Sequence, residues 1–165
     1  MQETGSLWHV LHVRPRCEKK TAEYCAVHGL RHDLPLRAET KIYQRRKVTV
    51  QKPVFPGYIF VVFESAERAT VLKSNMIVRI LAVTDQRQLI RELDQVKQAL
   101  AVDPTLDACA AFTQGRRVRI GGGPFQRLEG IVQIVRGQTR VVLNVDLIGR
   151  AVAVEADMAL LEPVD

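Results

Sequence analysis

The chain has 165 residues, 47% of them hydrophobic and 25% charged, which fits one or two globular domains and argues against a disordered or fibrous protein. No stretch approaches the roughly 18 consecutive apolar residues of a membrane span, and the N-terminus lacks a secretion signal, so we expect a cytoplasmic protein without a membrane part. The formal net charge is +6, and the segment 37–52 alone carries +5, with six basic residues against Glu39. Such a patch predicts a polyanion or an acidic protein surface as a partner, and the alternative is a solvated hairpin tip.

The first 30 residues predict a strand followed by a helix. Leu7–Val13 is rich in β-branched and aromatic residues and ends before Pro15, which is typical of a strand. Over Glu18–His28, small and apolar residues recur at spacings of three and four, and Gly29 stands where a helix C-terminal cap belongs. The segment 18–28 is therefore the first predicted helix.

The next segments are predicted to be extended. Short extended pieces are expected near Pro35–Leu36 and over Lys41–Val50, with the basic tetrad Gln44–Lys47 in a turn between them. Val54–Phe63 is the most apolar segment of the chain, and alternation along a strand would place apolar side chains on both of its faces. Both faces of this strand therefore need a covering.

A short helix at 66–73, a strand at 76–83 and a longer helix capped by Asp85 complete the first predicted domain. One apolar stripe of the longer helix should cover a sheet face, and its members are Leu89, Leu93, Val96 and Leu100. The segment 101–111 contains Pro104 and two aspartates and is predicted to be a linker. Beyond it, short strands broken by turns favour a small barrel, and they are expected at 117–120, 130–136, 140–145 and 151–155.

Cysteine and histidine residues indicate neither a disulfide framework nor a metal site. Cys17, Cys25 and Cys109 are an odd number without close pairing, which favours a reducing compartment. Cys25, His28 and His32 have metal-like spacing, but the fourth ligand that a structural zinc needs is missing. We therefore expect no metal, no cofactor and, since no catalytic set has supporting context, no enzyme.

Several segments, in this order along the chain, resemble the NusG family of bacterial transcription elongation factors: Trp8–Leu11, Lys52–Val61, Gly123–Phe125 with Gly130, and Ile148–Ala151 with Val154–Glu155. The resemblance implies an α+β chain. An NGN domain over 1–101, with a mainly antiparallel, ferredoxin-like sheet and helices, would be followed by a linker at 102–113. A KOW domain over 114–165 would form a small all-β SH3-like barrel.

In that family the NGN domain docks an apolar depression onto the clamp helices of the largest RNA polymerase subunit, which stabilises the closed clamp and suppresses pausing or termination. The positions of this chain that match the depression are Phe55, Tyr58 and Phe60, with Trp8 as a neighbour. Aromatic anchors commonly dominate interface energies. We expect Tyr58 and Phe60 at the interface, whereas a core position is about equally expected for Trp8 and Phe55.

The resemblance also implies contacts with nucleic acid. Arg14, Lys19 and Lys20 lie where specialised members touch exposed non-template DNA, and such residues would bind phosphates with a steep salt dependence. The basic turn adds three more candidate nucleic-acid-binding residues, which are Arg45, Arg46 and Lys47.

The KOW part resembles a module that binds either the termination factor Rho or a small-subunit ribosomal protein, and the matching residues are Leu147, Ile148 and Arg150. An aromatic usually stands where Ile148 does, and Tyr where His9 does. These departures favour an operon-directed antitermination paralogue, and we expect the chain to be a monomer. The alternatives are a general factor coupled to Rho or the ribosome, and a ribosome- or RNA-binding KOW protein.

Overall fold

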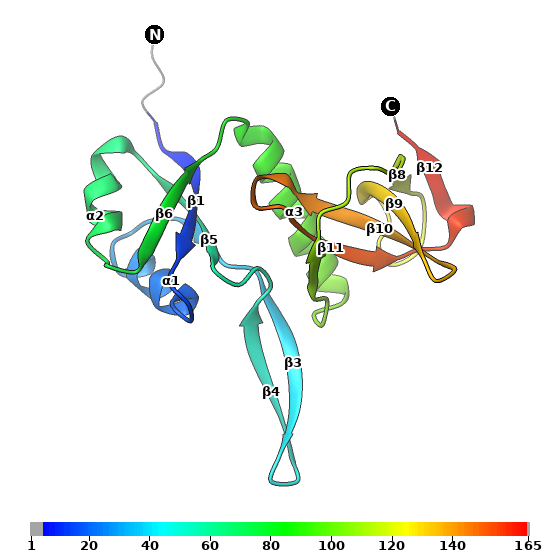
Figure 1. Cartoon of the computed structure of the whole chain (residues 1–165), viewed down its shortest axis with the longest axis horizontal. Coiled ribbons are helices and arrows are strands. Elements are labelled where there is room, and N and C mark those ends of the chain that lie inside the picture. Colours follow the sequence, from blue (N-terminus) through cyan, green and yellow to red (C-terminus); the bar gives the residue numbers. More distant parts are fainter. Residues whose placement is uncertain (1–4, 165) are drawn as a thin grey trace. The chain divides into compact units, whose positions relative to one another are not determined.

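The computed structural model describes residues 5–164 and contains both helices and antiparallel sheets, which confirms the α+β class (Figure 1). The chain divides into two compact units. One comprises Met1–Pro35 with Phe55–Gln86, and the other comprises Leu36–Val54 with Arg87–Asp165. In the described part of the chain, no helix is long and apolar enough to cross a membrane.

The elements of the first unit, in chain order, are β1 (Leu7–Val13), α1 (Glu18–Val27), β2 (His32–Asp33), β5 (Tyr58–Phe63), η1 (Ser65–Glu67), α2 (Arg68–Leu72) and β6 (Ile77–Ala82). The strands form one antiparallel sheet in the order β2-β5-β1-β6. The strands predicted at 7–13 and 76–83 and the helix predicted at 18–28 are confirmed. The short helix predicted at 66–73 begins as a 3-10 turn.

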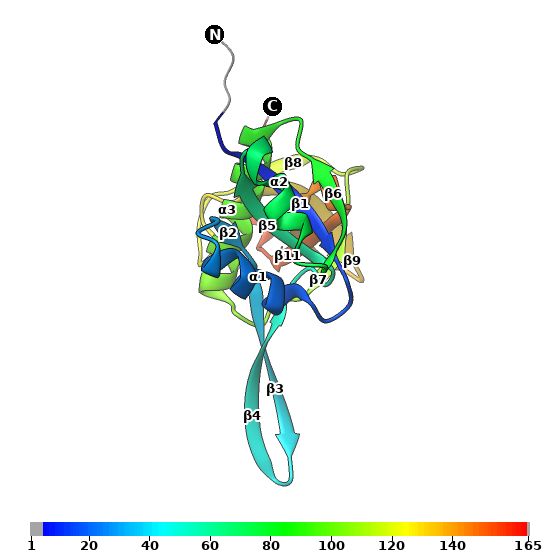
Figure 2. The ribbon, with the colours of Figure 1, turned by 90° about the vertical axis from the view of Figure 1, so that its left-hand side faces the viewer.

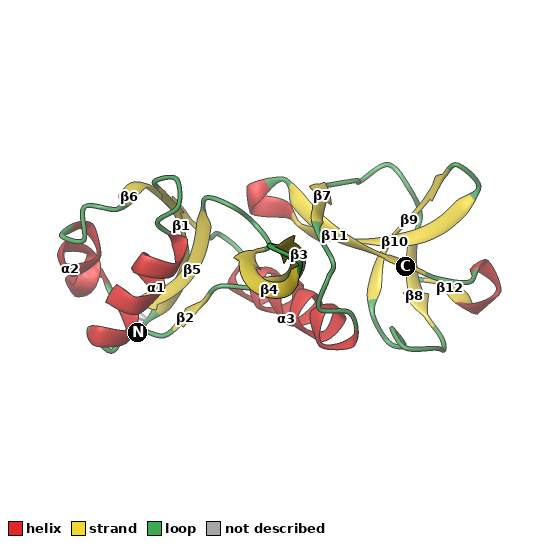
Figure 3. Ribbon diagram, turned by 90° about the horizontal axis from the view of Figure 1, so that it is seen from below, coloured by secondary structure: helices red, strands yellow, loops and turns green. Residues whose placement is uncertain are grey.

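One face of this sheet packs against α1 and α2 (Figure 3). The sheet contributes Leu11, Ile59 and Val61 to this core, α1 contributes Cys25 and α2 contributes Val71. All five side chains are buried because alternate strand positions and one helix stripe point into the same space. The helix α1 stops where Gly29 takes the left-handed backbone conformation expected of a C-terminal cap, with a φ of 68°.

The elements of the second unit are β3 (Leu36–Tyr43), β4 (Arg46–Pro53), α3 (Gln86–Val102, whose first residue belongs to the first unit), β7 (Ala108–Ala110), β8 (Arg117–Ile120), β9 (Glu129–Val135), β10 (Gln138–Val145), η2 (Asp146–Ile148), β11 (Arg150–Glu155), η3 (Met158–Leu160) and β12 (Leu161–Pro163). Within α3, the apolar stripe is buried at Leu89, Leu93 and Val96.

The strands β3 and β4 form a two-stranded antiparallel hairpin, seen as a long ribbon in Figure 2. Both strands are longer than the sequence predicted, and only Gln44 and Arg45 form the turn. Arg46 and Lys47 are therefore strand residues, which corrects the prediction of a four-residue basic loop. Gln44 and Arg45 have φ values of 49° and 66°, as the tight turns of two-residue hairpins require.

The remaining strands form an antiparallel sheet in the order β12-β8-β9-β10-β11-β7. The four strands that the sequence predicted are confirmed as β8 to β11, and β7 and β12 are additional. The strand β7 lies inside the predicted linker and pairs with β11, so part of that segment is regular structure rather than a flexible connection. Its sequence, Ala108-Cys109-Ala110, is too short and too weakly patterned to be predicted as a strand.

Candidate protein and nucleic-acid interfaces

The turn before β5 sets the position of Tyr58. Gly57 adopts a φ of 91°, which favours glycine, and its backbone N–H donates a 2.8 Å hydrogen bond to Oε2 of Glu18. The Gly57 carbonyl oxygen accepts a 2.8 Å hydrogen bond from the N–H of Val13. Glu18 is itself buried, with 7% of its surface exposed. The start of β5 is therefore fixed by a side chain of α1 and by the end of β1.

The strand register places three of the four predicted polymerase-binding residues on one sheet face, and the fourth, Phe55, lies in the turn before β5. Tyr58 lies opposite His12, Phe60 opposite Val10, and Trp8 opposite Val62, and residues directly opposite each other point to the same side. Because side chains alternate along each strand, this face is the one that does not contribute to the core under α1 and α2.

Phe55 and Phe60 are not exposed on this face. Their exposed fractions are 2% and 0%, and their rings meet edge to face with centroids 6.5 Å apart. The expectation of a docking face with Phe60 at its surface is therefore wrong for Phe60, and Phe55 takes the core alternative. Phe60 lies in β5, an interior strand of the sheet, opposite the fully buried Val10, and its ring also packs against Phe55. Whether they contribute to binding through this packing stays a prediction.

Tyr58 is half-buried and stacks on the half-buried imidazole of His12, with ring centroids 5.3 Å apart. The sequence prediction missed His12. Alternation along the first strand places His12 on the same face as Trp8, and this alternation is the sequence feature from which His12 could have been predicted. The pairing of His12 with Tyr58 depends on the register of β1 against β5, which the sequence does not specify.

Trp8 lies at the other end of the same face, four positions from His12, or about 13 Å along the strand. Its backbone is held by Gln86, whose Oε1 accepts from the Trp8 N–H at 2.8 Å and whose Nε2 donates to the Trp8 carbonyl at 2.9 Å. The exposed Arg31 guanidinium lies 5.4 Å from the centre of the half-buried indole ring, a cation–π contact. Trp8 and Tyr58 therefore flank Phe60 instead of touching each other.

His9, one of the residues that departs from the family pattern, points to the opposite face. Its imidazole stacks on Phe63 with ring centroids 3.8 Å apart. Burial lowers the pKa of His9 below its ordinary value of 6.5, and the charge of Arg68 acts in the same direction. This histidine is therefore part of the packing of the sheet.

The three basic residues predicted near the first helix are all exposed. Arg14 follows β1, and its backbone N–H donates to the Met76 carbonyl at 2.9 Å, while Lys19 and Lys20 lie in the first turn of α1. Arg16, which the prediction omitted, is also exposed and has a φ of 63°. These four exposed cations fall within seven consecutive residues of one unit, and the acidic residue among them, Glu18, is buried.

The hairpin separates its charges into a paired base and a basic tip. At the base, Glu39 lies 3.6 Å from Arg37, 3.5 Å from Lys41 and 2.6 Å from Lys52. The hydrogen bond from Lys52 is the main cause that lowers the pKa of Glu39. Within residues 5–164, all ion pairs recorded on the hairpin lie at this base.

At the tip of the hairpin the three predicted basic residues, Arg45, Arg46 and Lys47, are exposed. Two apolar neighbours are exposed as well, Ile42 by 75% and Tyr43 by 69%. Tyr43 lies directly opposite Arg46 in the strand register. Because cross-strand partners point to the same side, an aromatic ring and a cation share one side of the tip.

The predicted partner-binding residues of the second sheet form a continuous turn. Leu147 and Ile148 lie in η2, and Arg150 begins β11 after the left-handed Gly149, whose φ is 65°. Leu147 is 43% exposed, Arg150 is exposed and Ile148 is half-buried. Leu147 and Arg150 are therefore accessible, whereas Ile148 is partly covered.

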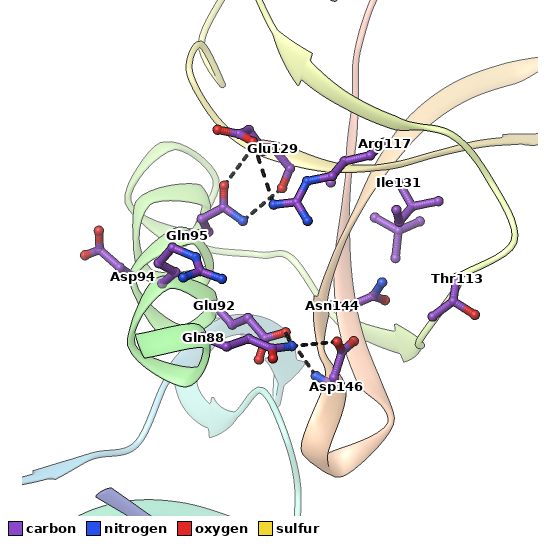
Figure 4. Close-up of a pocket in the computed structure, with 13 residues that line it drawn as sticks. Gln88, Glu92, Asp94, Gln95, Thr113, Arg117, Glu129, Ile131, Asn144 and Asp146 are labelled. Atoms are coloured by element: carbon purple, nitrogen blue, oxygen red, sulfur yellow. Dashed lines mark hydrogen bonds and ion pairs between the residues drawn. The ribbon is translucent and has the colours of Figure 1, made fainter. Parts of the chain in front are cut away.

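A polar cleft of about 540 Å³ lies between α3 and the strands β9 and β10 of the second unit (Figure 4). Gln95 of α3 faces Glu129, while Gln88 and Glu92 face Asp146, the first residue of η2. Burial raises the pKa of the Glu92 carboxyl above its ordinary value of 4.5. The sequence prediction did not assign any of these residues to a site, because only the fold brings them together.

The Cys25, His28 and His32 set does not converge. Cys25 is buried, and burial raises the pKa of its thiol to about 11. The Nδ1 atoms of His28 and His32 lie 2.9 and 3.1 Å from the carbonyl oxygens of Tyr24 and Leu30. Among residues 5–164, no group of three or more His, Cys, Asp or Glu side chains could hold a metal ion.

A family model and two relatives show which known proteins this chain is similar to, and all three carry the description NusG. A family model described as transcription termination factor NusG matches residues 6–100. A transcription termination/antitermination protein NusG of Borreliella burgdorferi is 24% identical over 144 residues, which cover 79% of this chain and 78% of the relative. The protein of the same description from Treponema pallidum is 25% identical over 147 residues, covering 78% and 77% of the two chains.

Proposed function

Because this chain belongs to the NusG family of transcription termination and antitermination factors, which are not enzymes, we propose that it binds RNA polymerase through the sheet face that carries Tyr58. Bound there, it stabilises the closed clamp and suppresses pausing or termination. The observation that carries the proposal is the half-exposed Tyr58–His12 stack at a position matching the family's polymerase-binding depression.

The burial of Phe55 and Phe60 supports two different tasks for the aromatic residues. Tyr58, His12 and Trp8 offer partly exposed rings to the clamp helices, and Phe55 with Phe60 supports the strand that carries Tyr58. Rigid, partly apolar rings of this kind commonly supply the largest interface energies, about 2 kcal/mol or more each when truncated.

Two basic segments are proposed to contact nucleic acid in the elongation complex. Arg14, Lys19 and Lys20 are exposed cations within seven residues of the chain and suit the phosphates of non-template DNA. The basic tip of the hairpin, defined here as Arg45, Arg46 and Lys47, is a second such surface. Both sets offer positive charge, which supports affinity for phosphates, whereas base recognition would need side chains in a fixed bidentate geometry.

The turn with Leu147, Ile148 and Arg150 is proposed to recruit a further protein, either Rho or a small-subunit ribosomal protein. An exposed leucine beside an exposed arginine supports a protein contact of mixed apolar and charged character. With Ile148 half-buried and not aromatic, the contact would differ from that of the general factor. This supports an operon-directed paralogue.

The experiment that tests the elongation role measures pause lifetimes of the cognate RNA polymerase on a defined template, with and without the chain. We expect the wild type to shorten pauses and Tyr58→Ala to abolish this effect. Tyr43→Ala removes the same side chain from the exposed hairpin tip and should retain pause suppression on templates where the tip makes no contact. Unchanged pausing with the wild-type chain, despite tight polymerase binding, would contradict the elongation role.

A second candidate function is RNA binding by the basic tip, because Tyr43 is 69% exposed and shares a side of the hairpin with Arg46. An aromatic ring beside cations is a surface on which single-stranded bases stack. This candidate predicts RNA binding that weakens steeply with salt and is unaffected by Tyr58→Ala. The polymerase proposal instead predicts that Tyr58→Ala weakens binding to RNA polymerase.

A further inference from the structure

One side of α3 carries a polar stripe that makes specific hydrogen bonds with the second sheet. The stripe consists of Gln88, Glu92 and Gln95, whose spacings of four and three residues place them on one side of the helix. It is separate from the buried apolar positions Leu89 and Leu93 of the same helix.

The first contact of the stripe is a reciprocal pair of hydrogen bonds. Nε2 of Gln95 donates to the carbonyl oxygen of Glu129 at 2.9 Å, and the backbone N–H of Glu129 donates to Oε1 of Gln95 at 2.7 Å. The side-chain amide of Gln95 thereby satisfies both the N–H and the carbonyl of Glu129, the first residue of β9, as the backbone of a paired strand would. Such a two-point contact fixes both distance and orientation.

The second contact fixes the turn that begins at Asp146. Nε2 of Gln88 donates to Oδ2 of Asp146 at 2.7 Å, and the backbone N–H of Asp146 donates to Oε2 of Glu92 at 3.3 Å. Gln88 also donates to the Glu92 carboxylate at 3.2 Å, which joins the two contacts into one network (Figure 4). The turn η2 is therefore held at its first residue by both its side chain and its backbone.

The contact is polar rather than an apolar core. The cleft beside it is lined by charged and amide side chains, among them Arg91 and Arg117. Contacts of this kind are easier to open than packed apolar ones, because water can replace each hydrogen bond that is lost. The raised pKa of Glu92 agrees with a carboxylate that is partly withdrawn from water.

We propose that the polar stripe Gln88, Glu92 and Gln95 is a docking surface for the second sheet of the same chain, and that it orders the Asp146 turn while leaving Leu147 and Arg150 exposed. The docking surface goes beyond the proposed function and does not depend on polymerase binding. Only its use, the presentation of Leu147 and Arg150 to a partner, rests on the proposed role of those residues.

Amide hydrogen exchange of the full chain, resolved by residue with NMR, tests this docking directly. In the wild type, the Glu129 amide should be protected. Gln95→Ala should speed its exchange at least tenfold, while the amides inside the β9–β10 ladder keep their protection. Gln98→Ala is the matched control, because Gln98 is exposed on the same helix and its amide donates to Asp94 Oδ2 of that helix, at 3.0 Å.

Gln95→Glu is a second variant. Its carboxylate can still accept from the Glu129 N–H but cannot donate to the Glu129 carbonyl. The Glu129 amide should therefore exchange at a rate between those of the wild type and Gln95→Ala. A second readout is the rotational correlation time from backbone ¹⁵N relaxation. In the wild type, α3 and the second sheet should have the same correlation time. In the double variant Gln88→Ala/Gln95→Ala, the correlation time of the second sheet should become shorter than that of α3. Exchange at Glu129 that is identical in wild type and Gln95→Ala, or independent tumbling in the wild type, would overturn the proposal.

Discussion

At the scale of single residues, the position of Tyr58 depends on the buried carboxylate of Glu18. Its Oε2 accepts the hydrogen bond of the Gly57 N–H, one residue before Tyr58. We predict that Glu18→Ala lowers the free energy of unfolding by about 1–3 kcal/mol, because a part-buried backbone donor loses its partner. Glu18→Gln keeps an oxygen acceptor and should lose less. Urea unfolding of both variants checks this, and equal losses would contradict the role given to the acceptor.

His9 makes stability depend on pH. Its pKa is lowered in the fold, mainly by burial, so the unfolded chain binds a proton more readily than the folded chain. The stability that this residue contributes is therefore present above its ordinary pKa of 6.5 and is lost as the pH falls through the lower folded value. We predict that acidification from pH 7.5 to pH 5.5 destabilises the wild type more than His9→Phe, which keeps a ring against Phe63. Denaturation midpoints at the two pH values measure the difference, and equal losses would refute the prediction.

Sequence reasoning found the site residues that local sequence features or family motifs mark, and it missed those that depend on strand pairing. Tyr58, Arg14, Lys19 and Lys20 could be named because they match positions of the family, and the basic residues of the hairpin tip could be named because charge is a local property. The burial of Phe60 and the stacking of His12 on Tyr58 depend on which strands pair and in which register. Register is a tertiary property, so the available sequence signals indicated the face without indicating which of its rings are exposed.

At the scale of elements, the strands with clear apolar alternation were predictable from sequence, and the weakly patterned ones were not. The predicted strands at 117–120 and 140–145 are present as β8 and within β10. By contrast, β7 and β12 have three residues each and are defined by pairing with β11 and β8. Such strands are stabilised by their neighbours, so their own residues carry little signal.

The hairpin β3–β4 is the element whose charge has the clearest testable consequence. The three basic residues at its base are ion-paired with Glu39, whereas the basic tip is exposed and can attract polyanions. We predict that replacing Arg45, Arg46 and Lys47 by Gln weakens binding of single-stranded nucleic acid and reduces the slope of log K against log salt by up to about 2. Titrations at several salt concentrations give this slope.

The control for the basic tip removes the same charge elsewhere in the same unit. Arg116, Arg127 and Arg136 are all exposed and lie outside the hairpin. Replacing these three by Gln should leave the salt slope nearly unchanged if the tip is the nucleic-acid contact. Equal reductions by the two triple variants would mean that net charge, and not the tip, governs binding.

At the scale of the whole molecule, the family was evident from sequence because its motifs run in order over most of the chain. The match over residues 6–100 and the two NusG relatives confirm that assignment. What the sequence did not indicate is the polar contact between α3 and the second sheet. Amide and carboxylate side chains on a helix surface are common, and their partners become known only when the fold brings distant segments together.

The central claim is that the face carrying Tyr58 binds RNA polymerase. The most direct measurement is the affinity of the full chain for the cognate core enzyme without nucleic acid, at moderate salt. We predict tight binding by the wild type and by Tyr43→Ala, and binding at least tenfold weaker by Tyr58→Ala, with the fold of each variant verified by circular dichroism. Equal affinity of Tyr58→Ala and wild type, or no binding by the wild type, would contradict the account.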